Sequence, residues 1–262
     1  MKKQLNLLYF SPTGTTEKIV KAAGGKISDN AKEYNITLPV SRESMLSFTK
    51  DDLVIVGVPV YSGRIPAIIE DYLKNISGDN TLAVLVAVYG NREYDDALLE
   101  LKDIFVSKGF IPIAAAAFLG EHSFTDKLAG GRPDNDDIKT AENFGLDVKN
   151  KLDKISSISD IKPLFVKGNF PYRERKPGSP MTPSTSNECV SCGVCASACP
   201  TSAIDFDDFS KIKEDKCITC CSCVKRCPTG AKSVQTEGFK KASAWLIENF
   251  SAVRKEPEIF IQ

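Results

Sequence analysis

The chain has 262 residues, of which 42% are hydrophobic, enough for one or two domains with a buried core. Its 34 basic residues balance its 34 acidic residues, so the composition favours neither a nucleic-acid nor an anionic-lipid partner. No apolar stretch approaches the roughly 18–20 residues that span a bilayer. The apolar run near the N-terminus is short and broken by Pro12, so we do not expect a signal peptide. The expected location is the cytoplasm, where thiols stay reduced.

Residues 4–10 (QLNLLYF) predict a strand that ends in a hydroxyl-rich turn, SPTGTT, and leads into a helix through about residue 23. The N-terminus of a helix at such a turn offers unpaired N–H groups to an anion. The turn lacks the lysine of a P-loop, and the chain has no GxGxxG motif. The turn resembles the [TS]-x-T-G-x-T phosphate loop of flavodoxins, although an ordinary capped helix start would also fit. The resemblance implies that the phosphate of FMN is held by Ser11, Pro12, Thr13, Gly14, Thr15 and Thr16.

Apolar runs alternate with helical patterns through residues 1–160, which we expect to form one domain. Runs rich in valine and isoleucine are typical of strands buried in a parallel sheet. The alternation predicts an α/β fold with a five-stranded, parallel, doubly wound sheet. Five strands fit the flavodoxin-like order, with the ligand beyond the carboxyl ends of the strands at the switch point. The predicted strands after the first are 34–38, 52–58, 82–88 and 111–118, and the later helices are 65–75, 93–108 and 135–155.

Two loops at these strand ends carry tyrosines and glycines. They occupy the places of the two flavin-embracing loops of flavodoxins, in which aromatic rings stack on the isoalloxazine. Tyr61 stands where flavodoxins often have tryptophan, and Tyr89 and Tyr94 compete for the second stacking position. An aromatic side chain at a strand end can also simply pack in the core. The resemblance implies flavin-binding roles for Val60, Tyr61, Ser62, Gly63, Tyr89, Gly90, Asn91, Arg92 and Tyr94.

The connection at 119–135 is longer than most loops and contains His122, the only histidine of the chain. With no second histidine and no nearby cysteine, we do not expect a metal site there. One interpretation is an exposed histidine without a function. The other is a flap over the flavin, in which His122 or Ser123 adjusts the redox potential or the protonation of the flavin, so His122 joins the candidate cofactor-binding residues.

Residues 161–186 contain five prolines among basic and small residues, which predicts an extended, semi-stiff linker. Such a linker suggests the hypothesis of a homo-oligomer in which electrons pass to the flavin of a neighbouring subunit.

Residues 187–234 contain two cysteine runs of identical spacing, C-x2-C-x2-C-x3-C-P, offset by 28 positions. This is the pattern of bacterial ferredoxins with two [4Fe–4S] clusters, in which the fourth cysteine of each run ligates the other cluster. The segment is too short to bury much core, so the clusters would be required for its folding. The pattern implies one cluster on Cys189, Cys192, Cys195 and Cys227, and a second on Cys217, Cys220, Cys223 and Cys199.

Two other interpretations of the cysteines are weaker. Zinc sites usually take pairs of C-x2-C knuckles, not two complete four-cysteine runs with both prolines. A disulfide framework would need an oxidising compartment. The ninth cysteine, Cys221, aligns with Gly193 of the first run, so we expect a small filler rather than a ligand.

Residues 235–262 form the predicted C-terminal helical tail, with an amphipathic helix at 238–254. We expect this helix to pack back on the N-terminal domain rather than to bind a partner.

The whole chain resembles small iron–sulfur flavoproteins of anaerobic microbes, in which a flavodoxin-like domain precedes a small α+β 2[4Fe–4S] ferredoxin domain. The resemblance implies FMN and two [4Fe–4S] clusters as cofactors. It also implies an electron carrier that relays low-potential electrons between the clusters and FMN to an unknown redox protein. An FMN-dependent reductase of a quinone, nitro compound or nicotinamide is the alternative. A redox sensor is less well supported, because the chain has no DNA-binding motif, and we expect neither nucleic-acid nor membrane partners.

Overall fold

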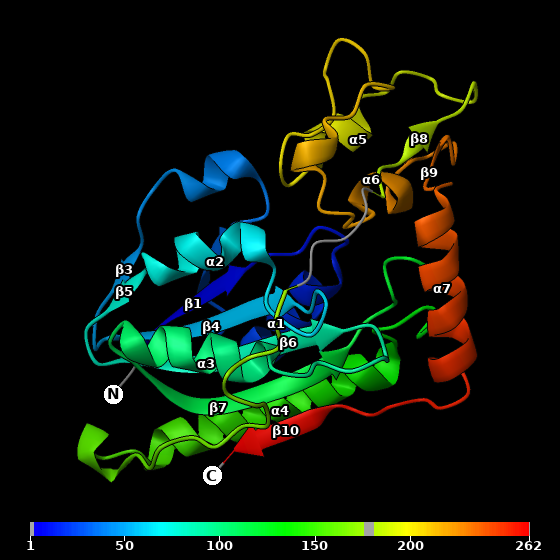
Figure 1. The fold of residues 1–262 in the computed structure, drawn as a ribbon. Helices are drawn as coiled ribbons and strands as arrows, with labels where there is room; N and C mark the ends of the chain where they lie inside the picture. Colours follow the sequence, from blue (N-terminus) through cyan, green and yellow to red (C-terminus); the bar gives the residue numbers. More distant parts are fainter. Residues whose placement is uncertain (1–2, 176–180, 262) are drawn as a thin grey trace.

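The computed structural model describes residues 3–175 and 181–261 as a sheet flanked by helices, with a smaller cysteine-rich lobe beside it (Figure 1). Five strands are parallel and lie in the spatial order β2-β1-β4-β6-β7. Numbered along the chain, these five have the order 2-1-3-4-5 of flavodoxin-like folds, which confirms the predicted fold class. The strands are β1 (Gln4–Tyr9), β2 (Ala31–Asn35), β4 (Asp52–Pro59), β6 (Thr81–Tyr89) and β7 (Phe110–Leu119).

Helices cover both faces of the sheet. On one face α1 (Thr15–Ile27) and α4 (Asn135–Lys154) enclose an apolar cluster, and on the other α2 (Ala67–Lys74) and α3 (Ala97–Ser107) enclose a second. Because neither face of the central strands meets water, all nine residues of β6 are buried. This is why the central strands read as continuous apolar runs in the sequence. Shorter elements are η1 (Pro39–Arg42), η2 (Ile158–Asp160) and the paired β3 (Ser47–Phe48) and β5 (Ser77–Gly78).

The sheet has a sixth strand that the sequence interpretation did not include. After α7 (Glu237–Phe250), the chain returns to the sheet, and β10 (Glu258–Ile261) pairs antiparallel with β7 (Figure 1). Phe260 packs against the apolar cluster on one face, and Ile261 against the cluster on the other. The predicted helical tail is therefore a helix followed by an edge strand. A four-residue strand is too short to show a periodic pattern.

Residues 161–175 of the predicted linker lie against the sheet domain, whereas residues 181–186 belong to the cysteine-rich lobe. Leu164 and Val166 are buried in the apolar cluster beneath α2 and α3. Backbone N–H groups of Asn169 and Arg173 donate to the carboxylate of Asp96, at 2.8 and 2.5 Å. These contacts hold the segment in place up to residue 175. Residues 176–180 of the predicted linker, with two of its prolines, lie outside the described residues.

The cysteine-rich lobe contains short elements only. β8 (Ser184–Thr185) pairs antiparallel with β9 (Lys232–Ser233), which brings the two ends of the lobe together. An antiparallel bridge joins Ile204 to Ile212, where a short hairpin is predicted. The helical turns are α5 (Val194–Ser197), η3 (Glu214–Lys216) and α6 (Ser222–Lys225). In the described part of the chain, no helix has the length and apolar character to cross a bilayer.

Candidate cofactor sites

Two cavities in the lobe are each lined by four of the predicted cysteine ligands. The first is lined by Cys189, Cys192, Cys195 and Cys227. The second is lined by Cys199, Cys217, Cys220 and Cys223. Each cavity thus combines three cysteines of one run with the fourth of the other, which is the crossed grouping of the ferredoxin pattern. Within residues 3–175 and 181–261, no three His, Cys, Asp or Glu side chains converge on a position for a single metal ion.

The internal repeat has a structural basis at the start of each short helix. Gly193 precedes α5 with φ of 74°, and Cys221 precedes α6 with φ of 58°. A residue with a Cβ is strained in this left-handed region, by roughly 1–2 kcal/mol. Cys221 is buried, lines the second cavity, and directs its thiol to the carbonyl of Thr219 at 3.6 Å. Cys221 is therefore a buried residue of the cavity wall outside the two sets of four.

The chemistry of the donor set fits a cationic cofactor in the second cavity. Burial raises the pKa of the Cys220 and Cys223 thiols to about 12. Thiolates are therefore unfavourable there unless a bound cation compensates for their charge, as iron would. The backbone N–H of Ala203 donates to the sulfur of Cys199 at 3.2 Å, the type of contact that tunes an iron–sulfur centre.

The two cavities differ in their exposure to solvent. In the first set Cys192 is exposed, and Cys189 and Cys227 are half-buried. In the second set only Cys217 is half-buried, and the other three are buried. The cysteines of the first set are therefore more exposed to solvent than those of the second set.

A third cavity lies at the carboxyl ends of four parallel strands, where flavodoxin-like folds bind their ligands. Seven of the predicted residues line it: Thr13, Thr15, Val60, Tyr61, Tyr89, Gly90 and His122. Its wall also includes Ser123, which the sequence offered as an alternative to His122, and four residues that were not predicted to bind: Pro59, Val88, Gly120 and Glu121. Their position at the ends of predicted strands and on the long 119–135 loop could have indicated that they line the cavity.

The predicted phosphate loop, residues 11–16, has features that fit an anion site. Gly14 adopts φ of 87° at the start of α1, a conformation that favours glycine. The hydroxyl of Ser11 accepts a hydrogen bond from the N–H of Glu17 at 3.0 Å, which fixes the turn. Among the described residues, the Thr16 hydroxyl is buried without a hydrogen-bond partner. A buried unpaired hydroxyl at a helix N-terminus fits a bound phosphate group.

The loop after β4 brings Tyr61 to the cavity by a tight turn. Tyr61 and Arg64 exchange backbone hydrogen bonds of 2.9 and 3.1 Å across Ser62 and Gly63, which both have positive φ. Two positive φ angles define the type I′ turn, for which glycine is well suited. A Cβ at Gly63 would lie 2.2 Å from the carboxylate of Asp95, so close packing also requires glycine there. Ser62 and Gly63 therefore shape the loop from outside the cavity wall.

The two tyrosines of the loop after β6 have different environments. Tyr89 lines the cavity, and its ring meets that of Tyr94 edge-on at 5.4 Å. Tyr94 is buried in the apolar cluster, and its hydroxyl donates to Glu258 of β10 at 2.9 Å. The structure therefore places Tyr89, and not Tyr94, on the cavity wall.

Asn91 and Arg92 lie away from the cavity. The Asn91 amide donates to the carbonyls of Phe250 and Val253, at 2.8 and 2.7 Å, and its oxygen accepts from the N–H of Lys255. Arg92 forms an ion pair with Asp95. These side chains position the C-terminal segment and the loop after β6. The sequence around Asn91 and Arg92 gives no indication of this role.

His122 is held in a defined orientation on the cavity wall. Its Nδ1 accepts a hydrogen bond from the N–H of Phe124 at 3.1 Å. Burial lowers the pKa of His122 to about 4, with further contributions from Lys225 and Arg92. The side chain is therefore neutral at pH 7, with its proton on Nε2. A Cβ at Gly90 would lie 2.6 Å from the ring, so the two loops pack closely here.

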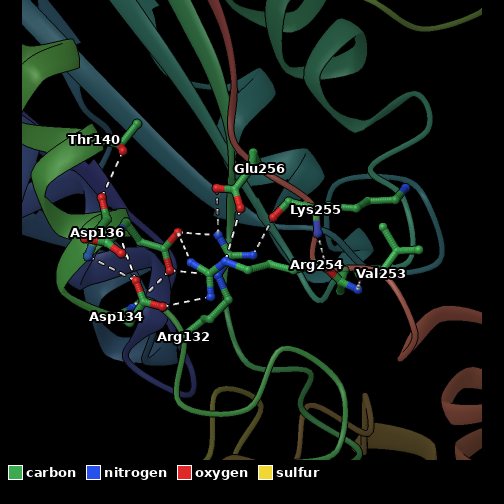
Figure 2. Close-up of polar contacts among 10 residues, drawn as sticks. Arg132, Asp134, Asp136, Thr140, Val253, Arg254, Lys255 and Glu256 are labelled. Carbon is green, nitrogen blue, oxygen red and sulfur yellow. Dashed lines mark hydrogen bonds and ion pairs between the residues drawn. The ribbon is translucent and has the colours of Figure 1, made fainter.

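The far end of the 119–135 loop is fixed by buried charges. The Nε of Arg132, which is 4% exposed, donates to Asp137 at 2.8 Å, and its Nη1 donates to the carbonyl of Lys255 at 2.6 Å. Figure 2 shows Arg132 beside Arg254 and Asp134, which form an ion pair at 2.9 Å between them. This network ties the loop to the N-terminus of α4 and to the segment that leads into β10.

Comparisons with known proteins bear on the two parts of the chain separately. The family model described as a 4Fe-4S dicluster domain matches residues 188–231. A search of curated proteins gave no match. Three solved structures are similar to this chain. Bacillus cereus flavodoxin 1 has 17% identity and a TM-score of 0.42, and the match covers 59% of this chain and 100% of that chain. A Fusobacterium nucleatum flavodoxin bound to flavin mononucleotide has 18% identity and a TM-score of 0.40, over 57% of this chain and 98% of that chain. The NADH:FMN oxidoreductase EmoB, in its apo form, has 17% identity and a TM-score of 0.42, over 62% of this chain and 95% of that chain.

These structural similarities are low, and the fold assignment depends instead on the strand order 2-1-3-4-5. The chain joins a flavodoxin-like α/β sheet to a ferredoxin-type 4Fe–4S segment. This combination is characteristic of redox proteins that transfer electrons or reduce substrates with flavin.

Proposed function

We propose that the protein is an electron carrier that relays low-potential electrons between two [4Fe–4S] clusters and FMN, and exchanges them with an unknown redox protein. The observation that carries the proposal is the adjacency of the second cysteine cavity and the cavity at the sheet edge. Residues 220–226 contact the loops that form that edge, including the loop predicted to hold phosphate.

The donor sets on the chain suit these three cofactors. Cys189, Cys192, Cys195 and Cys227 would hold one cluster, and Cys199, Cys217, Cys220 and Cys223 the other. The 11–16 turn would bind the FMN phosphate, and Tyr61 and Tyr89 would contact the isoalloxazine. When bound, the clusters supply one-electron exchange and the flavin supplies one- or two-electron exchange.

The different exposure of the two cysteine sets indicates where a redox partner would approach the protein. The first cavity faces solvent through Cys192, so this is where an external one-electron protein would approach. The second cysteine run contacts the loops of the flavin cavity, and three of the four cysteines of the second set are buried.

A second candidate function is an FMN-dependent reductase of a small acceptor. His122 favours it, because this neutral imidazole lies on the flavin cavity wall with a proton on Nε2. Glu121, the other ionisable side chain that the loop adds to the wall, is held by Lys225 and by the N–H of Gly131. An electron carrier needs neither side chain for acid–base chemistry.

Anaerobic kinetics separate the two functions. The carrier proposal expects rapid flavin reduction by a reduced ferredoxin, and slow reduction by NAD(P)H without sustained turnover of a quinone or nitro compound. A Cys192→Ser variant should slow the ferredoxin reaction. Rapid, self-contained turnover of a small substrate with NAD(P)H would instead support the reductase.

A further inference from the structure

The second cysteine run contacts the predicted phosphate loop directly. Ser222, in α6 between Cys221 and the ligand Cys223, is 1% exposed. Its hydroxyl donates to the carbonyl of Pro12 at 2.7 Å, and Arg226 donates to the same carbonyl from Nε at 3.1 Å. Two donors from the cysteine-rich lobe therefore fix one peptide unit of the SPTGTT turn.

Residues 220–226 also lie against two other loops of the flavin cavity, the 119–135 loop and the loop after β4. Lys225 forms an ion pair with Glu121, whose second carboxylate oxygen accepts from the N–H of Gly131 at 2.9 Å. Tyr61, on the loop after β4, lies next to Cys220 and Cys221, and burial raises the pKa of its phenol well above its usual range. Three of the four loops that line the flavin cavity thus lie close to residues 220–226.

The first cysteine run shows no equivalent set of groups. At the offset of 28, Ser222, Lys225 and Arg226 correspond to Val194, Ser197 and Ala198. Val194 is 38% exposed, and the hydroxyl of Ser197 donates within its own turn to Gly193 at 3.0 Å. The repeat is therefore asymmetric at the positions where the second run contacts the sheet domain.

We propose that Ser222 is a positioning residue that couples the occupancy of the second cysteine cavity to FMN binding. The lobe has little apolar core, so a cofactor held by the second cysteine set would fix α6. A fixed α6 holds the Pro12 carbonyl and with it the phosphate loop. This coupling is reciprocal, because each ligand favours the arrangement that the other requires. The inference rests on the proposed binding of FMN and of clusters.

The test compares flavin binding to anaerobically loaded full-length variants. Ser222→Ala removes the hydroxyl, and Ser197→Ala is the matched control in the first run. We expect Ser222→Ala to weaken FMN binding about five- to tenfold, the effect of one net hydrogen bond. Iron and sulfide content should remain at the wild-type level, and Ser197→Ala should bind FMN like the wild type.

Riboflavin distinguishes positioning of the phosphate loop from general damage. Because riboflavin has no phosphate, its affinity should be the same in the wild type and in Ser222→Ala. An equal loss for FMN and riboflavin, or unchanged FMN affinity with intact clusters, would overturn the inference.

Variants of the cysteine ligands test the coupling itself. Cys217→Ser, in the second set, should weaken FMN binding more than Cys189→Ser, in the first set. Equal effects would contradict the assignment of the coupling to the second cavity. If the wild-type protein has no affinity for FMN, the proposed function is wrong. If the wild type and Ser222→Ala bind FMN with equal affinity, only this inference is wrong.

Discussion

The only histidine of the chain gives a direct test of the flavin cavity at the scale of one residue. Burial lowers the pKa of His122 to about 4, against an ordinary value near 6.5. The folded protein therefore binds fewer protons than the unfolded chain between these two pH values. His122 contributes stability that is fully present above about pH 6.5 and is lost as the pH falls toward 4.

We expect the His122 imidazole to titrate with a midpoint near pH 4 and to carry its proton on Nε2 at pH 7. Nitrogen-15 NMR of histidine-labelled protein measures both properties, and the urea-unfolded chain provides the reference near 6.5. Since there is one histidine, the signal needs no assignment. A midpoint above pH 6 would show that the ring is exposed rather than packed against Gly90.

Some residues could be predicted from the sequence because their chemistry is local. In each cysteine set three members lie within a few positions of each other and the repeated spacing points to the fourth, and SPTGTT marks a helix start by its own composition. Local sequence could not show which of Tyr89 and Tyr94 lines the cavity. The choice depends on Glu258, 164 positions from Tyr94, whose strand has no clear pattern.

At the scale of elements, the segment after η2 is a docked strap and not a free spacer. Asp96, which is 3% exposed, accepts hydrogen bonds from the backbone of Asn169 and Arg173. Nearby, Glu100 pairs with Arg64 at 2.6 Å and with Arg175 at 3.2 Å. Proline content predicted an extended linker but gave no sign of these buried acceptors, which lie at the N-terminal end of α3.

Removing the Asp96 acceptor should release this strap. We expect Asp96→Ala to cost roughly 2–4 kcal/mol of local stability, because two N–H groups lose a charged acceptor. Limited proteolysis under anaerobic conditions should then cut residues 161–175 at least tenfold faster than in the wild type. Asp153→Ala, on the exposed surface of α4, is the control. Equal cleavage rates in all three proteins would contradict the docked arrangement.

The fold itself could be predicted from the sequence wherever the elements are buried on both sides. The strands β1, β4, β6 and β7 were recognisable because their apolar runs are long, whereas the exposed edge strand β2, with the sequence AKEYN, lies three residues before the predicted strand at 34–38. β10 was not recognisable from the sequence, because such a short edge strand depends on pairing with β7. It also depends on Arg132, which donates to the carbonyl of Lys255 just before the strand. Long-range pairing, not local propensity, specifies such an element.

At the scale of the whole molecule, the lobe presents one cysteine set to solvent and the other to the sheet domain. This asymmetry predicts biphasic loss of iron during controlled exposure to ferricyanide. The fast phase should remove about half of the iron, from the set that contains exposed Cys192, while FMN stays bound. Iron assays combined with EPR during oxidation would measure the two phases. A single phase, or flavin release together with the first iron, would contradict this order.

The central claim is that one chain holds two iron–sulfur clusters and a phosphate-anchored flavin. Anaerobic purification followed by counting of iron, sulfide and flavin per chain tests it most directly. We predict about eight iron atoms, about eight sulfides and about one FMN per chain, two [4Fe–4S] clusters accounting for the inorganic content. A colourless protein, or one that contains zinc in place of iron and no flavin, would contradict the account.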